Sequence, residues 1–323
     1  MPAPLPGIHH VTAITSDGQR NIDFYVGVLG LRLVKKTVNF DVPDTYHLYY
    51  GDWLGTPGTT MTFFVWPQLS SGPPGTGQVT AASFAVPGSS LGFWEERLGA
   101  HGVAAVRDSR FGEDVLSFHD PDGVQLELLG TAPPERWTPW GAGAVPVPHA
   151  IRGFHSVTLT VARHGPTVGL LEETMGFGTV AADGARVRLS TAGGGAGSLV
   201  DVVEAPQGGI GQEAAGTVHH VAWRALDDDH QLAWREALLG AGMQVTPVID
   251  RTYFHSIYYR ERGGVLFEVA TDLPGFAVDE HPQAFGFSLK LPPQYEAARA
   301  TLERQLPPLV VPDIIPAASG PEG

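Results

Sequence analysis

The sequence of 323 residues contains no cysteine. This absence excludes disulfide bonds, thiolate metal ligands and a cysteine nucleophile. Basic residues are also scarce, because 20 Lys and Arg stand against 34 Asp and Glu and give a net charge of −14. Nucleic acid and anionic membrane surfaces attract clustered basic side chains, so neither is an expected partner.

Long apolar runs are missing as well. No segment approaches the roughly 18 consecutive apolar residues that a membrane-spanning helix needs. The first residues, MPAPLPG, lack the basic and apolar regions of a signal peptide. We therefore expect a cytoplasmic protein that does not enter a membrane. The hydrophobic fraction of 43% is sufficient for a folded core.

Four segments of the chain repeat one pattern. Each begins with a glycine and an alternating, strand-like stretch: GIHHVTAIT from Gly7, GQVTAASFAV from Gly77, GFHSVTLTV from Gly153 and GTVHHVAWRA from Gly216. A helical spacing of apolar residues follows each stretch, and further strands end each unit. The pattern predicts an α+β fold of four βαβββ modules paired into two open barrel-like sheets.

Composition also predicts how the modules are grouped. The stretch TAPPERWTPWGAGAVPVPH, residues 131–149, is rich in Pro and Gly, which is typical of a linker. We expect four parts: an N-terminal domain of two modules over 1–135, a linker over 136–150, a C-terminal domain of two modules over 151–290, and a C-terminal helix with a Pro-rich tail over 291–323.

Two of the four modules carry a His-His pair at the start of their first strand, namely His9-His10 and His219-His220. A single histidine on such a strand is most often structural, but a pair repeated at equivalent positions is unusual. Because side chains alternate along a strand, only one histidine of each pair can point inward. The repeat register places four residues at that inward position: His10, Ala81, Ser156 and His220.

The final strand of each module gives a second repeat position, occupied by Thr62, Glu127, Asp201 and Glu268. If the first and last modules share a sheet, its inward set is His10, His220, Glu268 and Thr62. Two imidazoles and one carboxylate form the ligand set of a facial triad, which leaves open positions for O2 and a substrate. The other sheet would hold Ala81, Ser156, Glu127 and Asp201, which contain no imidazole, so we expect no transition metal there.

Six motifs together resemble a known family: HHVT, FYVGVLGLRLVKKTVNFD, YHLYYGDWLGTPGT, GFHSVTLTV, HHVAW and VLFEVATDLPGF. They are similar to the vicinal oxygen chelate (glyoxalase/bleomycin resistance/extradiol dioxygenase) superfamily, and within it to the hydroquinone-type ring-cleaving dioxygenases. The resemblance implies non-haem Fe(II), with Mn(II) in some members, bound by His10, His220 and Glu268. Catechol-cleaving members use the third and fourth modules, and Ser156 stands where they have a ligand histidine.

The resemblance also implies residues that surround the substrate. Five positions match: His9, Thr12, His219, Arg251 and Tyr258. Arg251 would hold an anionic oxygen and Tyr258 would donate to one, while His219 and Tyr258 are candidates for proton transfer. His9 and Arg251 are further catalytic candidates. His255, on the same stretch DRTYFHSIYYR, is an additional substrate-binding candidate, and His47 is expected to be structural.

The implied activity is ring opening of a hydroquinone-type or catechol-type diol with O2. One alternative is a glyoxalase-like isomerase or lyase. That chemistry resembles a four-ligand metal site with two carboxylates, so the neutral Thr62 at the fourth position counts against it. The other alternative is a metal-free resistance protein that binds an aromatic compound, and the retained His/His/Glu set counts against it. The expected partners are a small aromatic diol and O2, and exposed strand edges between modules favour a homo-oligomer.

Overall fold

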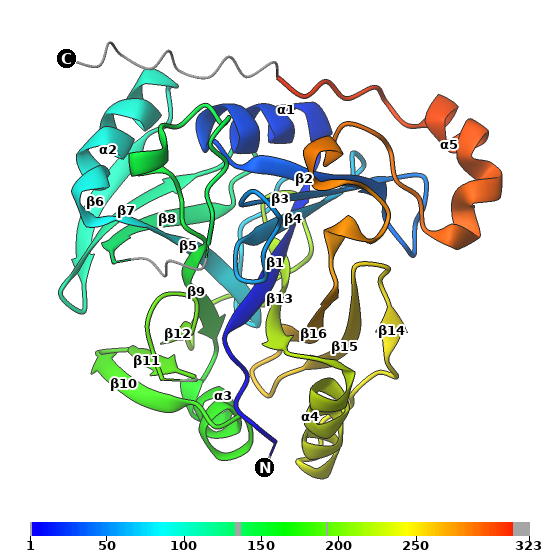
Figure 1. Cartoon of the computed structure of the whole chain (residues 1–323). Helices are drawn as coiled ribbons and strands as arrows, with labels where there is room; N and C mark the ends of the chain where they lie inside the picture. Colours follow the sequence, from blue (N-terminus) through cyan, green and yellow to red (C-terminus); the bar gives the residue numbers. More distant parts are fainter. Residues whose placement is uncertain (1, 133–136, 192, 313–323) are drawn as a thin grey trace.

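The computed structural model describes residues 2–132, 137–191 and 193–312, and the repeat pattern is present throughout them (Figure 1). Module one contains β1 (Ile8–Thr15), α1 (Gly18–Ile22), the π-helical η1 (Asp23–Val28), β2 (Arg32–Val38), β3 (Tyr46–Gly51) and β4 (Thr60–Val65). Module two contains β5 (Gln78–Pro87), η2 (Gly88–Ser90), α2 (Leu91–Ala100), β6 (Ala105–Arg110), β7 (Glu113–His119) and β8 (Gln125–Thr131).

The second half of the chain repeats this order. Module three contains β9 (Phe154–Val161), α3 (His164–Gly169), the π-helical η4 (Leu170–Thr174), β10 (Gly178–Asp183), β11 (Arg186–Ser190) and β12 (Leu199–Glu204). Module four contains β13 (Val218–Ala225), α4 (Asp228–Gly240), β14 (Ile249–Asp250), β15 (Phe254–Arg260) and β16 (Leu266–Pro274). The prediction of four βαβββ modules is therefore confirmed.

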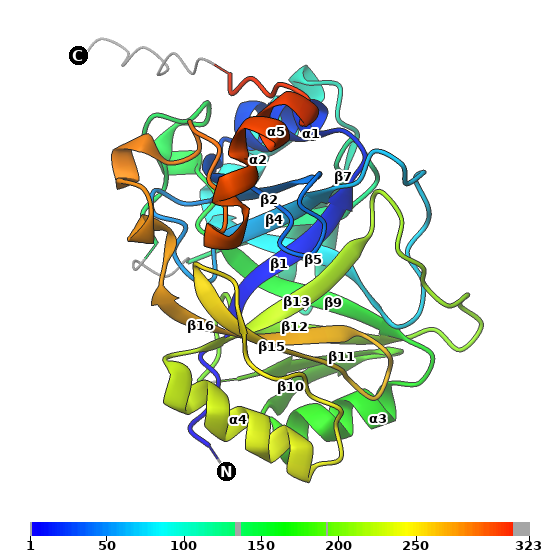
Figure 2. The ribbon, with the colours of Figure 1, turned by 90° about the vertical axis from the view of Figure 1, so that its right-hand side faces the viewer.

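The strands form two eight-stranded sheets with matching topology. The first sheet has the order β14-β15-β16-β13-β1-β4-β3-β2, and the second has the order β10-β11-β12-β9-β5-β8-β7-β6. Each sheet thus joins two modules, one and four in the first, two and three in the second, through an antiparallel central pair. Helices α1 and α2 lie on one side of the strands, and α3 and α4 lie on the other (Figure 2).

The alternating and helical patterns explain where the core lies. All eight residues of β1 are buried, because this strand lies between two neighbours at the centre of its sheet. In α4, Trp234 and Leu238 are buried at a helical spacing, and α2 buries Trp94 and Leu98 in the same way. These apolar faces attach each helix to the outside of its own sheet.

The segment between the halves is packed against both of them. Trp137 is buried, and a Cβ added to Gly58, Gly153 or Gly197 would lie within 2.7 to 2.9 Å of its ring. Residues 133–136, at the predicted boundary, and 313–323, in the predicted tail, lie outside the described residues. Because each sheet takes one module from each half, the division into domains at residues 136–150 stays a prediction.

Short helical turns complete the chain: η3 (Val147–His149), η5 (Phe276–Val278), η6 (Pro282–Ala284), η7 (Pro293–Ala298) and then α5 (Arg299–Gln305). Segment 276–285 is tied to the first sheet by Lys35, whose ammonium group contacts Asp279 at 2.7 Å and Glu280 at 2.8 Å. Among the described residues, no helix has the length and apolar character needed to cross a membrane.

Candidate metal centre

Three side chains of metal-ligand type converge at the centre of the first sheet: His10 on β1, His220 on β13 and Glu268 on β16. The Nε2 atoms of His10 and His220 lie 3.3 Å apart. Oε2 of Glu268 lies 3.3 Å from Nε2 of His10 and 2.9 Å from Nε2 of His220. Ligands about 2.1 Å from an ion and at right angles to one another would be separated by about 3.0 Å. The triangle therefore matches one face of an octahedral site.

The chemistry of the donor atoms fits a divalent cation. Oε1 of Glu268 accepts a hydrogen bond from Ser256 at 2.5 Å, but the buried Oε2 has no hydrogen-bond partner among the described residues. An unpaired buried carboxylate oxygen is costly unless a cation compensates it. Burial alone would raise the pKa of Glu268, but positive charge at His10 and His220 holds this pKa well below its usual range, and a bound cation would supply positive charge at the same place. The ionised form is thus the available ligand.

The outer histidine of the first pair orients the inner one. Nε2 of His9 lies 3.1 Å from the carbonyl of Thr271, and Nδ1 of His9 lies 2.9 Å from Nδ1 of His10. Burial and the neighbouring His10 lower the pKa of His9 to about 3, so its ring is neutral. Since the carbonyl only accepts, His9 donates from Nε2 and accepts the Nδ1 proton of His10. The lone pair of His10 at Nε2 is then directed at the triangle.

The second pair has the same arrangement. Nδ1 of His219 lies 2.7 Å from Nδ1 of His220, and Nε2 of His219 lies 3.7 Å from Oε1 of Glu213. Burial and the neighbouring His220 lower the pKa of His219 to about 3. Each His-His pair therefore combines an inner ring, aimed at the triangle, with an outer ring behind it, and in the first pair the carbonyl of Thr271 also fixes the tautomer.

A cavity in front of the triangle contains three of the predicted substrate residues, Thr12, Arg251 and Tyr258. Nε of Arg251 donates to the hydroxyl of Tyr258 at 3.2 Å, and its guanidinium contacts Asp41 at 3.2 Å. Burial alone would lower the pKa of Arg251, but Tyr258 and the carboxylates of Asp41 and Glu268 raise it. Burial and Glu268 also raise the pKa of Tyr258, so the cavity presents a permanent cation beside a protonated phenol.

The remaining wall of the cavity is aromatic, with Phe40, Phe64 and Phe254 among its residues. Such a wall suits a flat, apolar ring whose polar substituents contact the triangle and Arg251. Phe254 also packs against the inner histidine of β1, with ring centroids 5.0 Å apart. The cavity thus combines aromatic contact with two polar sides.

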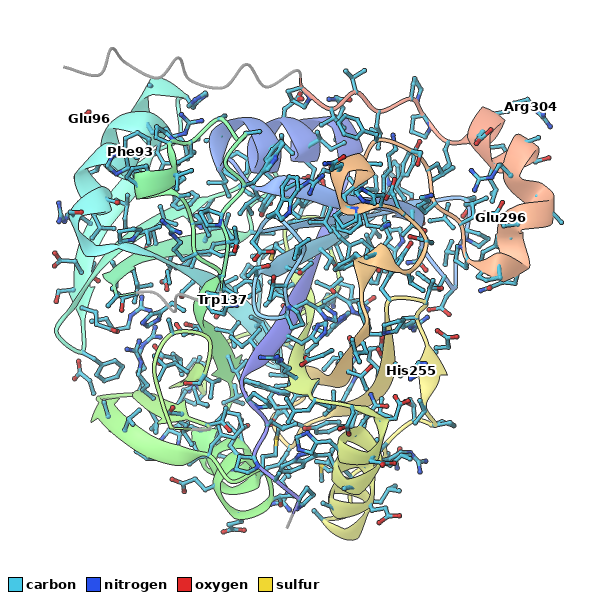
Figure 3. The ribbon with its side chains drawn as sticks, in the orientation of Figure 1. Phe93, Glu96, Trp137, His255, Glu296 and Arg304 are labelled. Atoms are coloured by element: carbon cyan, nitrogen blue, oxygen red, sulfur yellow. The ribbon has the colours of Figure 1, made fainter. Side chains whose placement is uncertain are left out.

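His255 is not brought to this cavity, contrary to the expectation from the sequence. Its Nδ1 lies 2.6 Å from Oδ1 of Asp228 at the start of α4 (Figure 3). Strand alternation explains this placement. Phe254, Ser256 and Tyr258 face the triangle, so His255 faces the other side of the sheet. His9 and His219 also lie outside the cavity wall, behind the inner histidines.

His47 and Tyr49 are among the cavity residues that were missed from the sequence. His47, expected to be structural, lines the cavity together with Tyr49, two residues further along β3. Their spacing on a strand places both side chains on one face. That spacing is the only signal in the sequence, and it becomes informative once β3 is known to lie beside β4 in the first sheet.

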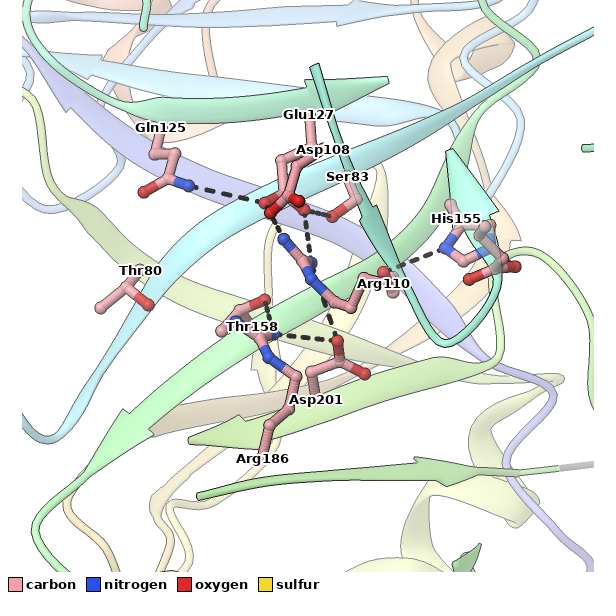
Figure 4. A network of polar contacts seen from close by, with 12 residues as sticks. Thr80, Ser83, Asp108, Arg110, Gln125, Glu127, His155, Thr158, Arg186 and Asp201 are labelled. Atoms are coloured by element: carbon pink, nitrogen blue, oxygen red, sulfur yellow. Dashed lines mark hydrogen bonds and ion pairs between the residues drawn. The ribbon is translucent and has the colours of Figure 1, made fainter. Parts of the chain in front are cut away.

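The second sheet has charged side chains in place of the open triangle (Figure 4). Arg110 donates to Glu127 at 3.0 and 2.7 Å and lies 3.8 Å from Asp201. Arg188 donates to Asp201 at 2.6 and 3.0 Å, and Arg186 donates to it at 2.9 Å. The guanidinium groups thus supply the positive charge that a metal ion would bring to Glu127 and Asp201.

The two remaining positions of this sheet, Ala81 and Ser156, offer no imidazole. Among the described residues, the group with metal-ligand geometry is the triangle of the first sheet. We therefore expect one tightly bound divalent ion per chain. Metal analysis after titration and gel filtration checks this number, and two equivalent tight sites per chain would contradict the assignment.

The sequence of the whole chain agrees with this architecture. Residues 7–128 and 153–269 match the family model of the Glyoxalase/Bleomycin resistance protein/Dioxygenase superfamily. The chain belongs to this superfamily. The two matched segments cover both sheets and contain all three residues of the triangle.

Relatives in the superfamily include named dioxygenases. MhqO of Bacillus subtilis, provisionally named a ring-cleaving dioxygenase, is 48% identical over 305 residues, covering 94% of this chain and 97% of that protein. The chlorohydroquinone/hydroquinone 1,2-dioxygenase of Sphingobium indicum is 38% identical over 322 residues, covering 96% and 99%. A Bacillus subtilis crystal structure, also provisionally named a dioxygenase, has 47% identity and a TM-score of 0.91, covering 96% and 99%.

Proposed function

We propose that the protein is an Fe(II)-dependent dioxygenase that opens the ring of a hydroquinone-type diol with O2, with Mn(II) as the alternative ion. The observation that carries the proposal is the triangle of two imidazoles and one carboxylate, with a cavity of aromatic and polar residues in front of it. The named hydroquinone dioxygenase among the relatives supports the substrate class. The neutral Thr62 at the fourth repeat position favours a dioxygenase over a glyoxalase-like enzyme.

His10, His220 and Glu268 would hold the ion on one face and leave the opposite face open. When bound, a ferrous ion supplies a Lewis acid that favours the ionised form of a substrate hydroxyl and a redox partner for O2. The three side chains together carry one negative charge, so the site retains positive charge toward an anionic substrate. The aromatic wall excludes water around the ring.

Arg251 and Tyr258 have separate tasks in this proposal. The guanidinium binds an anionic oxygen of the substrate, because it stays charged in the buried cavity. Tyr258 keeps its proton and donates it to an oxygen that gains negative charge during the reaction. Both nitrogens of His9 are engaged, so its task is to orient His10. His219, on the more exposed side, is the better candidate to exchange a proton with solvent.

Metal analysis combined with O2 uptake tests the function. Purified protein loaded anaerobically with Fe(II) is given hydroquinone, substituted hydroquinones and catechol, and the ring-opened product is identified by mass spectrometry. We expect O2 uptake that requires the metal and is fastest with a hydroquinone. Full activity of metal-stripped protein would contradict the proposal, as would binding without turnover or a product formed without O2. A preference for catechol would overturn the substrate class.

Arg251→Ala is expected to keep the metal and lose turnover. Loss of such a contact to a developing charge typically costs about 2–4 kcal/mol, so kcat/KM should fall by about 30-fold to 1,000-fold. The matched control is Arg260→Ala, on β15 of the same module, whose guanidinium contacts a carbonyl of Gly264 in an exposed position. Kinetics and metal content are measured on both variants. Equal losses in the two would show that Arg251 has no specific task.

We also propose a cytoplasmic location and a homo-oligomer. In the described part of the chain, the outermost strands β6, β10 and β14 have no strand paired to their outer edges, which another chain could use. Analytical ultracentrifugation tests the assembly, and cell fractionation tests the location.

A further inference from the structure

His47 and Arg251 come to the cavity wall from different modules. His47 lies on β3, whereas Arg251 lies between β14 and β15, near the other end of the strand order of the first sheet. His47 is 8% exposed and lines the cavity together with Tyr49 and Thr12. Neither aromatic residue has a task in the proposed function above.

A continuous line of hydrogen bonds connects Tyr49 to Thr12. The hydroxyl of Tyr49 lies 2.8 Å from Nδ1 of His47, and Nε2 of His47 lies 2.9 Å from Oγ1 of Thr62. The Thr62 hydroxyl then donates to Oγ1 of Thr12 at 2.8 Å. In the described part of the chain, the Thr12 hydroxyl has no further hydrogen bond.

The last of these contacts fixes the direction of the whole line. Thr62 gives its one hydroxyl proton to Thr12, so its oxygen must accept the Nε2 proton of His47. A neutral imidazole with its proton on Nε2 has an acceptor at Nδ1. Nδ1 of His47 therefore accepts from the hydroxyl of Tyr49. The hydrogen bond from Thr62 to Thr12 thus determines the tautomer of His47 and the orientations of the Thr62 and Tyr49 hydroxyls.

The protonation states agree with this direction. Burial, with the nearby His10 and His220, lowers the pKa of His47 well below its ordinary value, so its ring is neutral. Burial, with the nearby Tyr258, raises the pKa of Tyr49 well above its ordinary value, so its phenol keeps a proton to donate.

We propose that His47 and its two hydrogen-bond partners turn the Thr12 hydroxyl hydrogen into the cavity, toward an oxygen of the bound aromatic diol. His47, Tyr49 and Thr62 are positioning residues, because they act through Thr12. The oxygen of Thr12 already accepts from Thr62, so the hydrogen is left to face the cavity. This extension rests on the proposed function.

The position of this donor has a consequence for specificity. Arg251 and Thr12 line the same cavity, so a diol with one oxygen at the guanidinium can place its second oxygen at the Thr12 hydrogen. We expect the two hydroxyls of hydroquinone, at opposite ends of the ring, to use both groups better than the adjacent hydroxyls of catechol. The line of hydrogen bonds is therefore expected to favour hydroquinone over catechol.

The tautomer of His47 is the first test. Nitrogen-15 NMR of the full chain, loaded with zinc as a diamagnetic ion, identifies which ring nitrogen carries the proton. We expect a neutral ring protonated at Nε2 at pH 7, and a mixture of tautomers in Thr62→Val, which removes the acceptor of the Nε2 proton. A wild-type ring protonated at Nδ1, or an imidazolium, would overturn the proposal.

A double-mutant cycle is the second test. Thr62→Val and His47→Phe should each reduce the ratio of kcat/KM for hydroquinone to that for catechol by about tenfold, the effect of one lost hydrogen bond, with metal content unchanged. The double variant should resemble either single variant, because both interrupt one line. Thr62→Ser, which keeps the hydroxyl, should behave as wild type.

The two proposals fail in distinguishable ways. Absence of O2 uptake by the Fe(II)-loaded wild type with any diol overturns the function and this extension together. If the wild type turns over normally, three results would each overturn the extension alone. The effects of Thr62→Val and His47→Phe multiply in the double variant, Thr62→Ser is as impaired as Thr62→Val, or the hydroquinone-to-catechol ratio of kcat/KM stays unchanged in the variants.

Discussion

His220→Ala and Glu268→Ala are each expected to abolish O2-dependent ring opening and to bind metal much more weakly. The reduction in affinity should exceed the roughly 10-fold to 100-fold loss typical of removing an outer hydrogen-bond partner of a ligand. Thr62, the fourth residue of the repeat position, cannot compensate, because its hydroxyl already donates to Thr12 and lies 2.9 Å from His47. Metal content and O2 uptake are measured side by side on each variant.

Ser156→Ala provides the matched control for these variants. Ser156 occupies in the second sheet the repeat position of the inner histidines, and its hydroxyl contacts the neighbouring His155 at 3.1 Å. The control should keep the metal and full activity. Circular dichroism of the metal-free proteins shows whether the ligand variants are folded. A folded Glu268→Ala protein with normal metal content and turnover would refute the assignment of the triangle.

Arg110→Ala is expected to destabilise the protein by about 3–5 kcal/mol, the usual effect of removing one partner of a buried ion pair. Glu127 is 1% exposed and loses a bidentate guanidinium partner, with hydrogen bonds of 2.7 and 3.0 Å. The hydrogen bond from Ser83 at 2.6 Å remains, but it does not neutralise the charge. Urea unfolding of the metal-loaded proteins measures the change in free energy.

Arg107→Ala is the control for this prediction. Arg107 lies three residues earlier on β6, but its side chain is 46% exposed and it contacts exposed carboxylates at 3.3 and 3.4 Å. Exposed ion pairs contribute up to about 1 kcal/mol, so this variant should unfold nearly as wild type. A double variant, Arg110→Met with Glu127→Leu, should recover most of the lost stability. Equal stability of Arg110→Ala and Arg107→Ala would contradict the role given to Arg110.

The repeat register explains why so much of the metal centre could be predicted from the sequence. Equivalent strands place equivalent residues side by side, so the alignment of His10 with His220 already implied a shared position. Glu268 was predicted as a ligand because counting from the glycine turn before the last strand places it at the repeat position shared by all four modules. The pairing of the first and last modules was a condition of the prediction from the sequence, and the sheet order meets it.

The cavity wall was harder to predict, because it depends on contacts between strands that are distant in sequence. His47 and Tyr49 reach the cavity only because β3 pairs with β4, and β4 with β1. His255 lies outside the cavity because strand alternation places it on the face opposite Phe254 and Tyr258, and the expectation from the sequence did not apply that alternation to the stretch DRTYFHSIYYR.

The arginines of the second sheet were also missed. Composition and register predicted the absence of imidazole near Glu127 and Asp201, but not the nature of their partners. Arg110 and Arg186 lie at the ends of β6 and β11, and Arg188 lies in the middle of β11. The boundaries of these strands are poorly defined by a single sequence. The available signal for these arginines was the pair Glu127 and Asp201 without a nearby histidine, because buried carboxylates require a cationic partner.

The fate of the two oxygen atoms of O2 tests the central claim most directly. Fe(II)-loaded protein is given hydroquinone under oxygen-18 gas, and the product is reduced at once so that an aldehyde oxygen cannot exchange with water. Ring opening beside a hydroxylated carbon converts that carbon to a carboxylic acid and its neighbour to an aldehyde, each receiving one atom of the same O2. The account predicts a ring-opened product that carries both labelled atoms, with one O2 consumed per hydroquinone. Incorporation of a single labelled atom, or an intact ring after O2 uptake, would contradict it.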